Sequence, residues 1–353
     1  MAPYYITLIF IIFVCSVTSK FRSLDNAVIL FLTIVSALFF SLRDYSVGSD
    51  TLLYLLNYNY LPINWSEFSR DYIGIFKESA FFILEFFIKR QDFEFYTVLF
   101  IISIFVYFLT YKTIYRYSDN IFLTVFLYIT LGFFLFGFNA ARQSITVALF
   151  LFSVKFIINR DFTKYTFVIL IGFFFHKSII LCLPCYFLYR KVLSFKYIII
   201  IGLAVLLLSA TLNQAITYLA NNVDVRYTKF SETLDQAMGT RLALINILIF
   251  SAVFIQSFFS KYSDTLNLFI NLSFIGVLIS SVSVLLRLDP NGLARAAYYF
   301  TQFFIFLVPV AISNIRNQQL KMVFYMGTIG FCLFYFHSRT SIYSGLYPYI
   351  FRT

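Results

Sequence analysis

Long apolar runs recur along almost the whole chain and are separated by shorter polar stretches. Most of these runs approach the roughly 17–25 residues that an α-helix needs to cross a bilayer. The pattern predicts about 12 spans, with the expected limits 4–19, 26–42, 95–111, 120–136, 140–158, 163–175, 178–189, 196–219, 242–259, 265–286, 294–313 and 320–336. We therefore predict an all-α, polytopic transmembrane helical bundle that forms one integral membrane domain over residues 1–353.

Two regions depart from this regular pattern. The predicted segments 163–175 and 178–189 are short and adjoin at His176. They form either two short crossings or one broken, re-entrant unit. Residues 78–93 are apolar on one face, which predicts an amphipathic helix that lies along the membrane interface.

The composition supports a membrane protein and gives the Lys and Arg residues a topological role. Charged residues make up 12% of the chain and hydrophobic residues 61%, whereas a soluble domain carries about 25% charged residues. The net charge is +11, but the basic residues are scattered between the apolar runs rather than gathered in one run. This distribution is typical of topogenic charges, and we expect no nucleic-acid partner.

Alternate loops differ in their charge, and the difference predicts an orientation. One set of short loops has a basic excess and is expected in the cytoplasm; its residues are Lys20, Arg22, Lys112, Arg116, Lys155, Arg160, Lys164, Arg190, Lys191, Lys196, Lys261, Arg316 and Lys321. The other set contains the long loops 43–94 and 220–241 together with both termini, and is expected on the outer side.

Four polar clusters interrupt the apolar pattern, and the predicted orientation places all of them on the outer side. A charged residue at the centre of a membrane costs about 2.5–3.5 kcal/mol, so such residues commonly line a cavity or take part in chemistry. The clusters are Arg43 with Gly48-Ser49-Asp50-Thr51 and Tyr54; Asn139-Ala140-Ala141-Arg142-Gln143; His176-Lys177-Ser178; and Arg295-Ala296-Ala297-Tyr298-Tyr299.

Arg142 and Arg295 are each predicted at the outer end of a helix that runs inward. The free N–H groups of a helix N-terminus bind anions, and Arg binds phosphate oxygens bidentately, so the two sites together suit a diphosphate. The alternative for each residue alone is that it snorkels to the interface or pairs with an acid. Helical spacing also places four polar residues on one face of a helix, and we predict that this face forms the wall of a cavity. The residues of this polar stripe are Asn139, Arg142, Gln143 and Thr146.

Two further residues have two interpretations each. His176 is either a structural residue at a helix break or a hydrogen-bond donor and proton shuttle. Asp50 is either the N-cap of the helix that starts near Thr51 or a base for a hydroxyl group. The chain has only 2 histidines, so we expect no metal site and no other cofactor.

The order of these motifs resembles the EpsG-type branch of bacterial polysaccharide polymerases, a group related in role to Wzy-type O-antigen polymerases. The matching residues are Arg43, Val47-Gly48-Ser49-Asp50-Thr51, Tyr54, Glu78 before Ala80-Phe81-Phe82-Ile83-Leu84, Asn139, Arg142-Gln143, His176-Lys177-Ser178, Pro184, Arg295 and Tyr347-Pro348-Tyr349. Family members tend to read Ile-Arg-Gln-Ala where this chain has Ala141-Arg142-Gln143-Ser144.

This resemblance implies a metal-independent glycosyltransferase of GT-C-like fold in the bacterial inner membrane, with an active site in an outward-facing cavity on the periplasmic side. Such an enzyme transfers a polyprenyl-diphosphate-linked glycan onto a sugar hydroxyl of another lipid-linked repeat unit, in O-antigen (lipopolysaccharide) or exopolysaccharide synthesis. Undecaprenyl diphosphate leaves, and the implied partners are the lipid-linked oligosaccharides, membrane lipid and a chain-length regulator.

The expected site residues follow from the four clusters together with the resemblance. Asp50, His176, Arg142 and Arg295 are expected to be catalytic. Diphosphate or sugar is expected to contact Arg43, Asn139, Gln143, Lys177, Tyr54 and Tyr298. Two alternatives remain: a flippase for lipid-linked oligosaccharides, for which related halves would be expected, and a membrane O-acyltransferase that uses His176.

Overall fold

The chain folds into helices. A computed structural model describes residues 1–18, 22–74, 77–188, 196–197, 199–201, 203, 236–286, 293–343 and 345–352. Within these ranges, the only β-pairing is one isolated bridge between Arg43 and Phe351. The helices belong to two compact units: unit 1 comprises Met1–Tyr186 and Arg316–Thr353, and unit 2 comprises Phe187–Ile315. That the whole chain is one domain stays a prediction.

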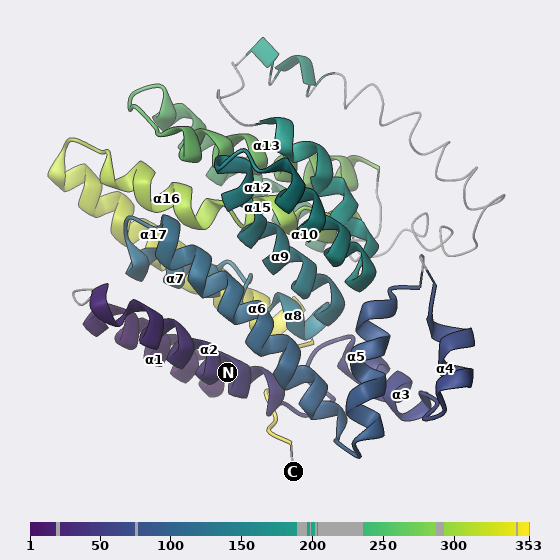
Figure 1. The fold of residues 1–353 in the computed structure, drawn as a ribbon. Coiled ribbons are helices and arrows are strands. Elements are labelled where there is room, and N and C mark those ends of the chain that lie inside the picture. Colours follow the sequence, from purple (N-terminus) through teal and green to yellow (C-terminus); the bar gives the residue numbers. More distant parts are fainter. Residues whose placement is uncertain are drawn as a thin grey trace. The chain divides into compact units, whose positions relative to one another are not determined.

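Unit 1 contains a layer of long apolar helices (Figure 1). α2 packs along α6, and α9 packs against both α6 and α10. The helices of this unit are α1 (Ala2–Thr18), α2 (Asp25–Ser41), α3 (Thr51–Tyr60), α4 (Trp65–Tyr72), α5 (Ser79–Arg90), α6 (Phe95–Tyr117), α7 (Ile121–Thr130), α8 (Phe136–Asn139), α9 (Ala141–Ile158), α10 (Phe162–Phe175) and α17 (Gln318–Ser338), while the 3-10 helix η2 (Lys177–Leu188) begins in it.

Unit 2 is built around α13 (Asp264–Leu285), which packs against α12 (Gln236–Ser257) and α15 (Tyr298–Thr301). A Cβ on Gly276 would lie 2.6 Å from Thr301 Cγ2, so this glycine allows the close approach of two helices. The predicted span 294–313 is not one straight helix. It consists of Ala294–Thr301 and Phe304–Ser313, which are bent by 47° at a short break.

The apolar helices confirm a multi-pass membrane protein. Among the described residues, five helices are long and apolar enough to cross a membrane, and the bent pair would make a sixth. Shorter apolar helices coincide with the predicted segments 4–19, 26–42, 120–136, 163–175 and 178–189. Most of the predicted segment 196–219 and residues 220–235 of the predicted loop 220–241 lie outside the described residues. The number of about 12 spans and the GT-C-like fold stay predictions.

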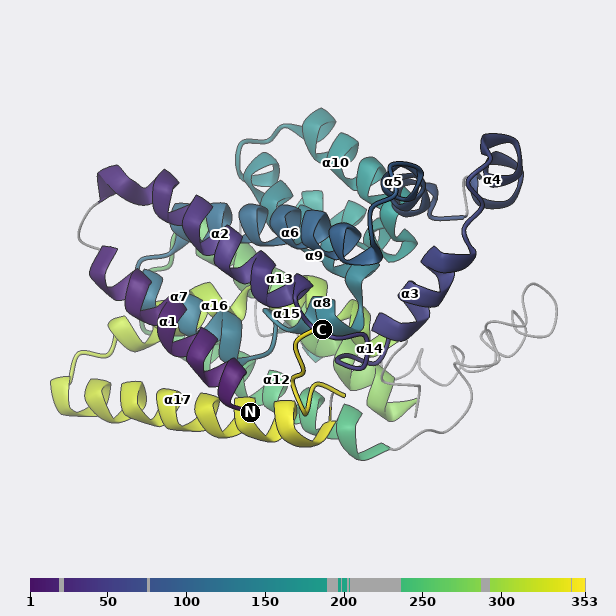
Figure 2. The same ribbon diagram turned by 90° about the horizontal axis from the view of Figure 1, so that it is seen from below.

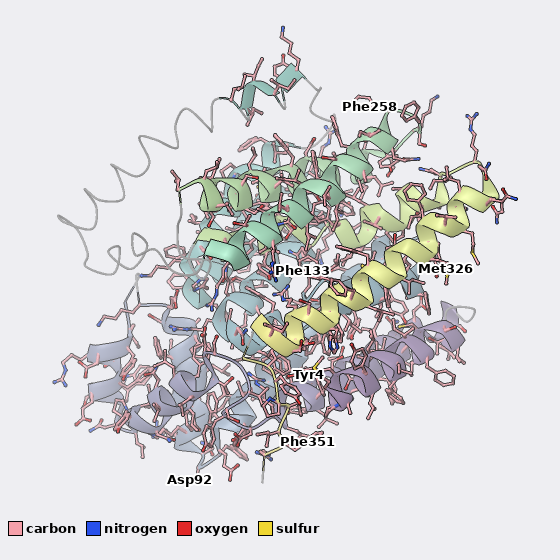
Figure 3. The ribbon with its side chains drawn as sticks, turned by 180° about the vertical axis from the view of Figure 1, so that it is seen from behind. Tyr4, Asp92, Phe133, Phe258, Met326 and Phe351 are labelled. Carbon is pink, nitrogen blue, oxygen red and sulfur yellow. The ribbon has the colours of Figure 1, made fainter. Side chains whose placement is uncertain are left out.

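The two termini lie at the same end of unit 1 (Figure 2). The Tyr4 hydroxyl donates to the Leu346 carbonyl at 2.5 Å, and the Tyr349 hydroxyl donates to the Phe39 carbonyl at 2.5 Å. Figure 3 labels Tyr4 and Phe351 close to each other at this end. Lys155 lies near the C-terminal end of α9. Its positive charge is repelled by those of Lys112 and Arg116 on α6 and of Lys164 on α10. The orientation of the chain in a membrane stays a prediction.

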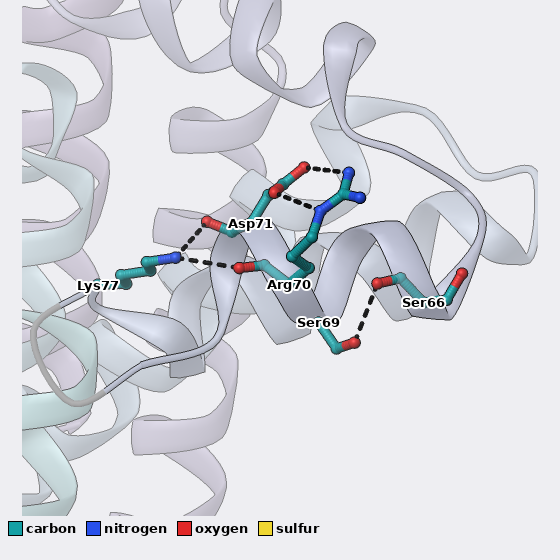
Figure 4. A network of polar contacts seen from close by, with 5 residues as sticks. All are labelled: Ser66, Ser69, Arg70, Asp71 and Lys77. Atoms are coloured by element: carbon teal, nitrogen blue, oxygen red, sulfur yellow. Dashed lines mark hydrogen bonds and ion pairs between the residues drawn. The ribbon is translucent and has the colours of Figure 1, made fainter.

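The polypeptide between α2 and α6 forms a small helical layer of its own. The predicted amphipathic helix over 78–93 is present as α5, and it packs against α4 through a core of Leu61, Phe68 and Phe86. Lys77 donates to the carbonyls of Arg70 and Asp71 at 3.2 and 3.0 Å, which ties the residue before Glu78 to the end of α4 (Figure 4).

Candidate active site

A tight turn at Gly48 brings the first polar cluster against the second. Gly48 has φ +96, and a Cβ there would lie 2.4 Å from the Phe138 carbonyl oxygen, so no larger residue fits without a backbone shift. The Ser49 N–H donates to Asn139 Oδ1 at 3.0 Å. The Gly48 N–H donates to the Gly345 carbonyl at 2.9 Å, so the C-terminal segment closes the same turn.

Arg43 is enclosed beneath this turn. Its side chain is 0% exposed and lies between the rings of Phe40 and Phe138, with Cζ 4.0 and 4.4 Å from their centroids. Nε donates to the Val47 carbonyl at 3.2 Å, Nη2 donates to Thr51 Oγ1 at 3.4 Å, and Nη1 donates to the Phe40 carbonyl. The structure therefore uses Arg43 to hold the loop after α2, and its expected contact with a ligand stays a prediction.

Asp50 stands at the start of α3 but does not cap it through its side chain. The N-cap position makes no side-chain hydrogen bond to the helix, and Asp50 Oδ1 instead accepts from Ser49 Oγ at 2.8 Å. Asp50 thus occupies the predicted N-cap position, but the side-chain bond expected of a cap is absent. The expected role as a base is not tested by this geometry.

The centre of the site is Glu78, which joins three separate segments of unit 1. Its Oε2 lies 2.9 Å from Arg142 Nη1, and its Oε1 lies 2.7 Å from His176 Nδ1. The backbone N–H of Lys177 also donates to Oε1, at 3.4 Å. The side chains of Glu78, Arg142 and His176 are 13%, 26% and 30% exposed. We call these three residues the ionic cluster.

Local backbone geometry places each member of the ionic cluster at a helix end. Glu78 precedes α5 in the left-handed region, with φ 55, a conformation that is uncommon for a residue other than glycine. His176 is extended where α10 ends and η2 begins, so the predicted break at this residue is confirmed. Arg142 is the second residue of α9.

Aromatic rings surround the Arg142 side of the ionic cluster. The guanidinium carbon lies 5.3 Å from the ring centroid of Tyr54, 5.5 Å from that of Phe81 and 5.8 Å from that of Phe82. Cations at such distances over ring faces are attracted to them, and the rings also exclude water from the ion pair. Tyr54 and Arg142, two of the predicted site residues, are thereby brought together.

The charge of Glu78 is maintained by its partners. Burial by itself raises the pKa of this carboxyl, but contact with His176 and the positive charge of Arg142 outweigh that effect and lower the pKa. His176 Nδ1 has no hydrogen-bond partner of good geometry in spite of its 2.7 Å distance from Oε1. We therefore describe this contact as electrostatic.

The predicted polar stripe is not a single helical face. Asn139 ends α8 and α9 begins at Ala141, because Ala140 between them has φ −157 and ψ 59. Gln143 and Thr146 are buried, and the Thr146 hydroxyl donates to the Gln143 carbonyl at 2.8 Å. The prediction of one helical face is therefore wrong, and only Arg142 of this set belongs to the ionic cluster, whereas the expected cavity wall stays a prediction.

Arg295 and Tyr298 belong to unit 2. Arg295 lies in α14 (Leu293–Ala296), and Tyr298 is buried at the start of α15. The predicted breaker before them, Asp289-Pro290-Asn291-Gly292, lies outside the described residues. A convergence of Arg142 and Arg295 on one diphosphate stays a prediction.

Two carboxylates, Glu78 just before α5 and Glu85 within it, were missed as candidate site residues. Glu85 is fully buried, and neither of its carboxyl oxygens has a hydrogen-bond partner. Burial raises its pKa to about 8, although the charges of Arg142 and Lys89 act in the opposite direction. In the sequence, helical spacing over 78–93 places both acids on one face of the predicted amphipathic helix. That spacing was the signal, although in the structure Glu78 lies just before α5.

Comparison with known proteins gives one match. The sequence model of the EpsG family matches residues 26–351. This range contains Arg43, the ionic cluster, Arg295 and the Tyr347-Pro348-Tyr349 segment. A search of curated proteins and a search of solved structures gave no match.

Proposed function

Because the chain belongs to the EpsG family, whose members are membrane proteins of the polysaccharide polymerase type, we propose that it is a metal-independent glycosyltransferase that joins lipid-linked repeat units. It transfers a polyprenyl-diphosphate-linked glycan onto a sugar hydroxyl of a second lipid-linked unit. The reaction takes place at the periplasmic face of the inner membrane. The hydroxyl oxygen bonds to the anomeric carbon, the bond from that carbon to the diphosphate breaks, and the hydroxyl proton passes to a base.

The ionic cluster is the observation that carries this proposal. Three segments that are distant in the sequence meet at Glu78, at a partly exposed point next to the turn of Gly48-Ser49-Asp50-Thr51. Arg142 supplies a positive charge there, and His176 Nδ1 and the Lys177 backbone N–H lie beside the same carboxylate. An anion can take the place of the Glu78 carboxylate against these groups.

The chemistry of the leaving group explains why cations are needed. Breaking a glycosyl–diphosphate bond builds negative charge on the departing oxygen, and fixed cations in a water-poor site stabilise that charge. In this proposal, Arg142 and His176 bind the diphosphate, and Glu78 holds both side chains in position. Arg295 supplies a further contact, and Asp50 accepts the proton of the acceptor hydroxyl.

The proposal is tested by the length of the surface polysaccharide. With Arg142→Ala or Arg295→Ala, the host should lose the ladder of long chains on a gel and retain the band for a single repeat unit. The amount of protein in the membrane should stay normal. An unchanged ladder for both variants would contradict the diphosphate assignment, whereas loss of the single-repeat band would indicate a flippase.

Arg70→Ala is the matched control. Arg70 is exposed on α4 and pairs with its neighbour Asp71 at 3.1 Å (Figure 4). Such a surface pair contributes little to stability. The control should keep the full ladder. That result would show that the effect of Arg142→Ala comes from the loss of this particular arginine and not from a general loss of positive charge.

A further inference from the structure

A second polar site lies in unit 1, apart from the ionic cluster. A cleft with a volume of about 700 Å³ opens between α3, the turn from α5 to α6, and Arg352 near the C-terminus. Ligand pockets commonly have volumes of about 300–1,000 Å³. None of the three residues of the ionic cluster lines this cleft.

The cleft is preformed, because Lys89 and Tyr58 fix its walls. Lys89 Nζ donates to the carbonyls of Tyr58, Asn59 and Leu61 at 2.9, 2.7 and 2.6 Å. The Tyr58 hydroxyl donates to the Phe93 carbonyl at 2.6 Å. These bonds join the C-terminal end of α3 to the α5–α6 turn, so little order has to be gained when a ligand binds.

The groups that line the cleft suit hydroxyl-rich molecules. Asp92, Glu94 and Asn59 are exposed and offer oxygen acceptors, and the labelled Asp92 lies at the tip of the α5–α6 turn (Figure 3). Arg352 stacks over Tyr96, with Cζ 4.7 Å from the ring centroid, and its Nη1 lies 3.3 Å from Glu94 Oε2. Its charge and that of Lys89 balance the two carboxylates, so the cleft has no excess charge that would select an anion.

Two helices connect this cleft to the ionic cluster. α3 begins next to Asp50 and ends at the cleft, and α5 begins next to Glu78 and ends next to the cleft. Tyr54, which lies under Arg142, and Tyr58, which lines the cleft, are one helical turn apart. One turn of an α-helix rises about 5.4 Å. An extended chain that reacts at the ionic cluster can therefore reach the cleft.

From this juxtaposition we propose that the cleft is a saccharide-binding subsite, which holds a sugar segment of the lipid-linked substrate while its end reacts at the ionic cluster. Asp92, Glu94 and Asn59 accept hydrogen bonds from sugar hydroxyls, and the exposed ring of Phe93 gives an apolar face for a sugar ring. This assignment rests on the proposed polymerase function for the identity of the sugar chain.

Direct binding tests the subsite. The probe is a set of oligosaccharides released by partial acid hydrolysis from the host's own polysaccharide, and binding to the detergent-purified full chain is followed by saturation-transfer NMR. Asp92→Asn combined with Asn59→Ala should weaken binding at least tenfold. Asp71→Asn, which changes an exposed acid of α4 outside the cleft, should bind like the unchanged protein. Equal binding by the cleft variant and the unchanged protein would overturn the subsite.

Measurements of chain elongation distinguish a failure of the proposed subsite from a failure of the proposed polymerase function. If the subsite is correct, the cleft variant should still join two repeat units but should give shorter chains, because the growing chain is held less firmly. Cleft-dependent binding by a protein that shows no elongation would overturn the polymerase function and support the subsite. Full-length chains from the cleft variant, together with unchanged binding, would overturn the subsite alone.

Discussion

Two arginines of unit 1 lie close to the same turn yet have opposite surroundings. Arg43 is 0% exposed, and its donors are directed to backbone carbonyls and a threonine hydroxyl between two phenyl rings. Arg142 is 26% exposed and faces the carboxylate of Glu78. A cation enclosed by fixed carbonyls holds the fold together, whereas a partly exposed cation with an ionic partner can exchange that partner for a ligand.

The same contrast explains why the two residues were hard to separate in the sequence. Both are single arginines next to a polar turn at the predicted outer end of an apolar segment. The difference arises from Phe138, whose ring covers Arg43, and from Glu78, which is 64 positions before Arg142. The comparison therefore assigns stability to one region and chemistry to the other, and substitutions can test each assignment.

The largest effect is expected from Arg43→Met. Methionine fills part of the space but removes the donor to the Phe40 carbonyl, the donor to Thr51 Oγ1 and one of the two donors to the Val47 carbonyl, which keeps its bond from the Thr51 hydroxyl. Each buried group that loses its partner costs about 1–3 kcal/mol, so the variant should lose on the order of 3 kcal/mol or more. The melting temperature of the purified protein in detergent should fall sharply.

Arg142→Met is the control for this prediction. It removes an ion pair whose side chains are 26% and 13% exposed, while His176 stays beside Glu78, so the melting temperature should fall less than that of Arg43→Met. Its ladder of long chains should nevertheless be lost. Equal melting temperatures for the two methionine variants would contradict the division between a structural and a functional arginine.

The next largest effect is expected from Glu78→Gln, and it concerns the rate rather than the fold. Glutamine preserves the shape of the side chain but removes the negative charge that holds Arg142 and His176. Loss of such preorganisation commonly slows a reaction about 100-fold or more. The rate of chain elongation, measured with purified lipid-linked repeat units, should fall by this factor. Glu67→Gln, an exposed acid of α4, should leave the rate unchanged.

Much of the fold could be predicted from the sequence, because apolar runs alone define membrane helices. The helix break at His176 was also predictable, since two short runs adjoin there. The break at Ala140 was not predictable: Asn139, Arg142 and Gln143 have helical spacing, but Ala140 between them has φ −157 and ψ 59, which is not helical. The spacing of neighbouring residues cannot reveal a backbone turn that is stabilised by contacts with Gly48, about 90 positions earlier in the chain.

The site could be predicted only in part, for a related reason. Arg142 and His176 stand out as polar residues at the ends of apolar runs, whereas Glu78 precedes an apolar run in a long, polar loop that has several other acids. Its importance depends on contacts with residues 64 and 98 positions later, at 2.9 and 2.7 Å. Contacts over such separations cannot be read from one sequence, so the carboxylate that unites the site was missed.

A smaller effect on the rate is expected from His176→Gln. The substitution removes the imidazole next to Glu78 but leaves the contact between Glu78 and Arg142 in place. Loss of one hydrogen-bonding group is worth about 1 kcal/mol, so elongation should slow about tenfold. The combination of Glu78→Gln with His176→Gln should be little slower than Glu78→Gln alone. Fully multiplicative effects would show that the two side chains act separately.

The last prediction concerns Glu85→Gln and does not involve the rate; it extends the comparison to the buried carboxylate of α5. Burial raises the pKa of Glu85 to about 8, from a model value of 4.5. Between these values the folded protein keeps the carboxyl proton and the unfolded chain releases it. The stability that Glu85 contributes below pH 4.5 is therefore lost progressively as the pH rises to about 8.

Glutamine cannot ionise, so the variant should lack this loss. The melting temperature of Glu85→Gln should exceed that of the unchanged protein by an amount that grows from pH 5 to pH 8 and then stays level. Glu78→Gln should differ in its pH window: its partners lower the pKa of Glu78, so the stability of the ionised form is present above pH 4.5 and is lost only as the pH falls below that value. The difference for Glu78→Gln should therefore stay level from pH 5 to pH 8. A level difference for Glu85→Gln over the same range would show that the two carboxylates do not differ in charge.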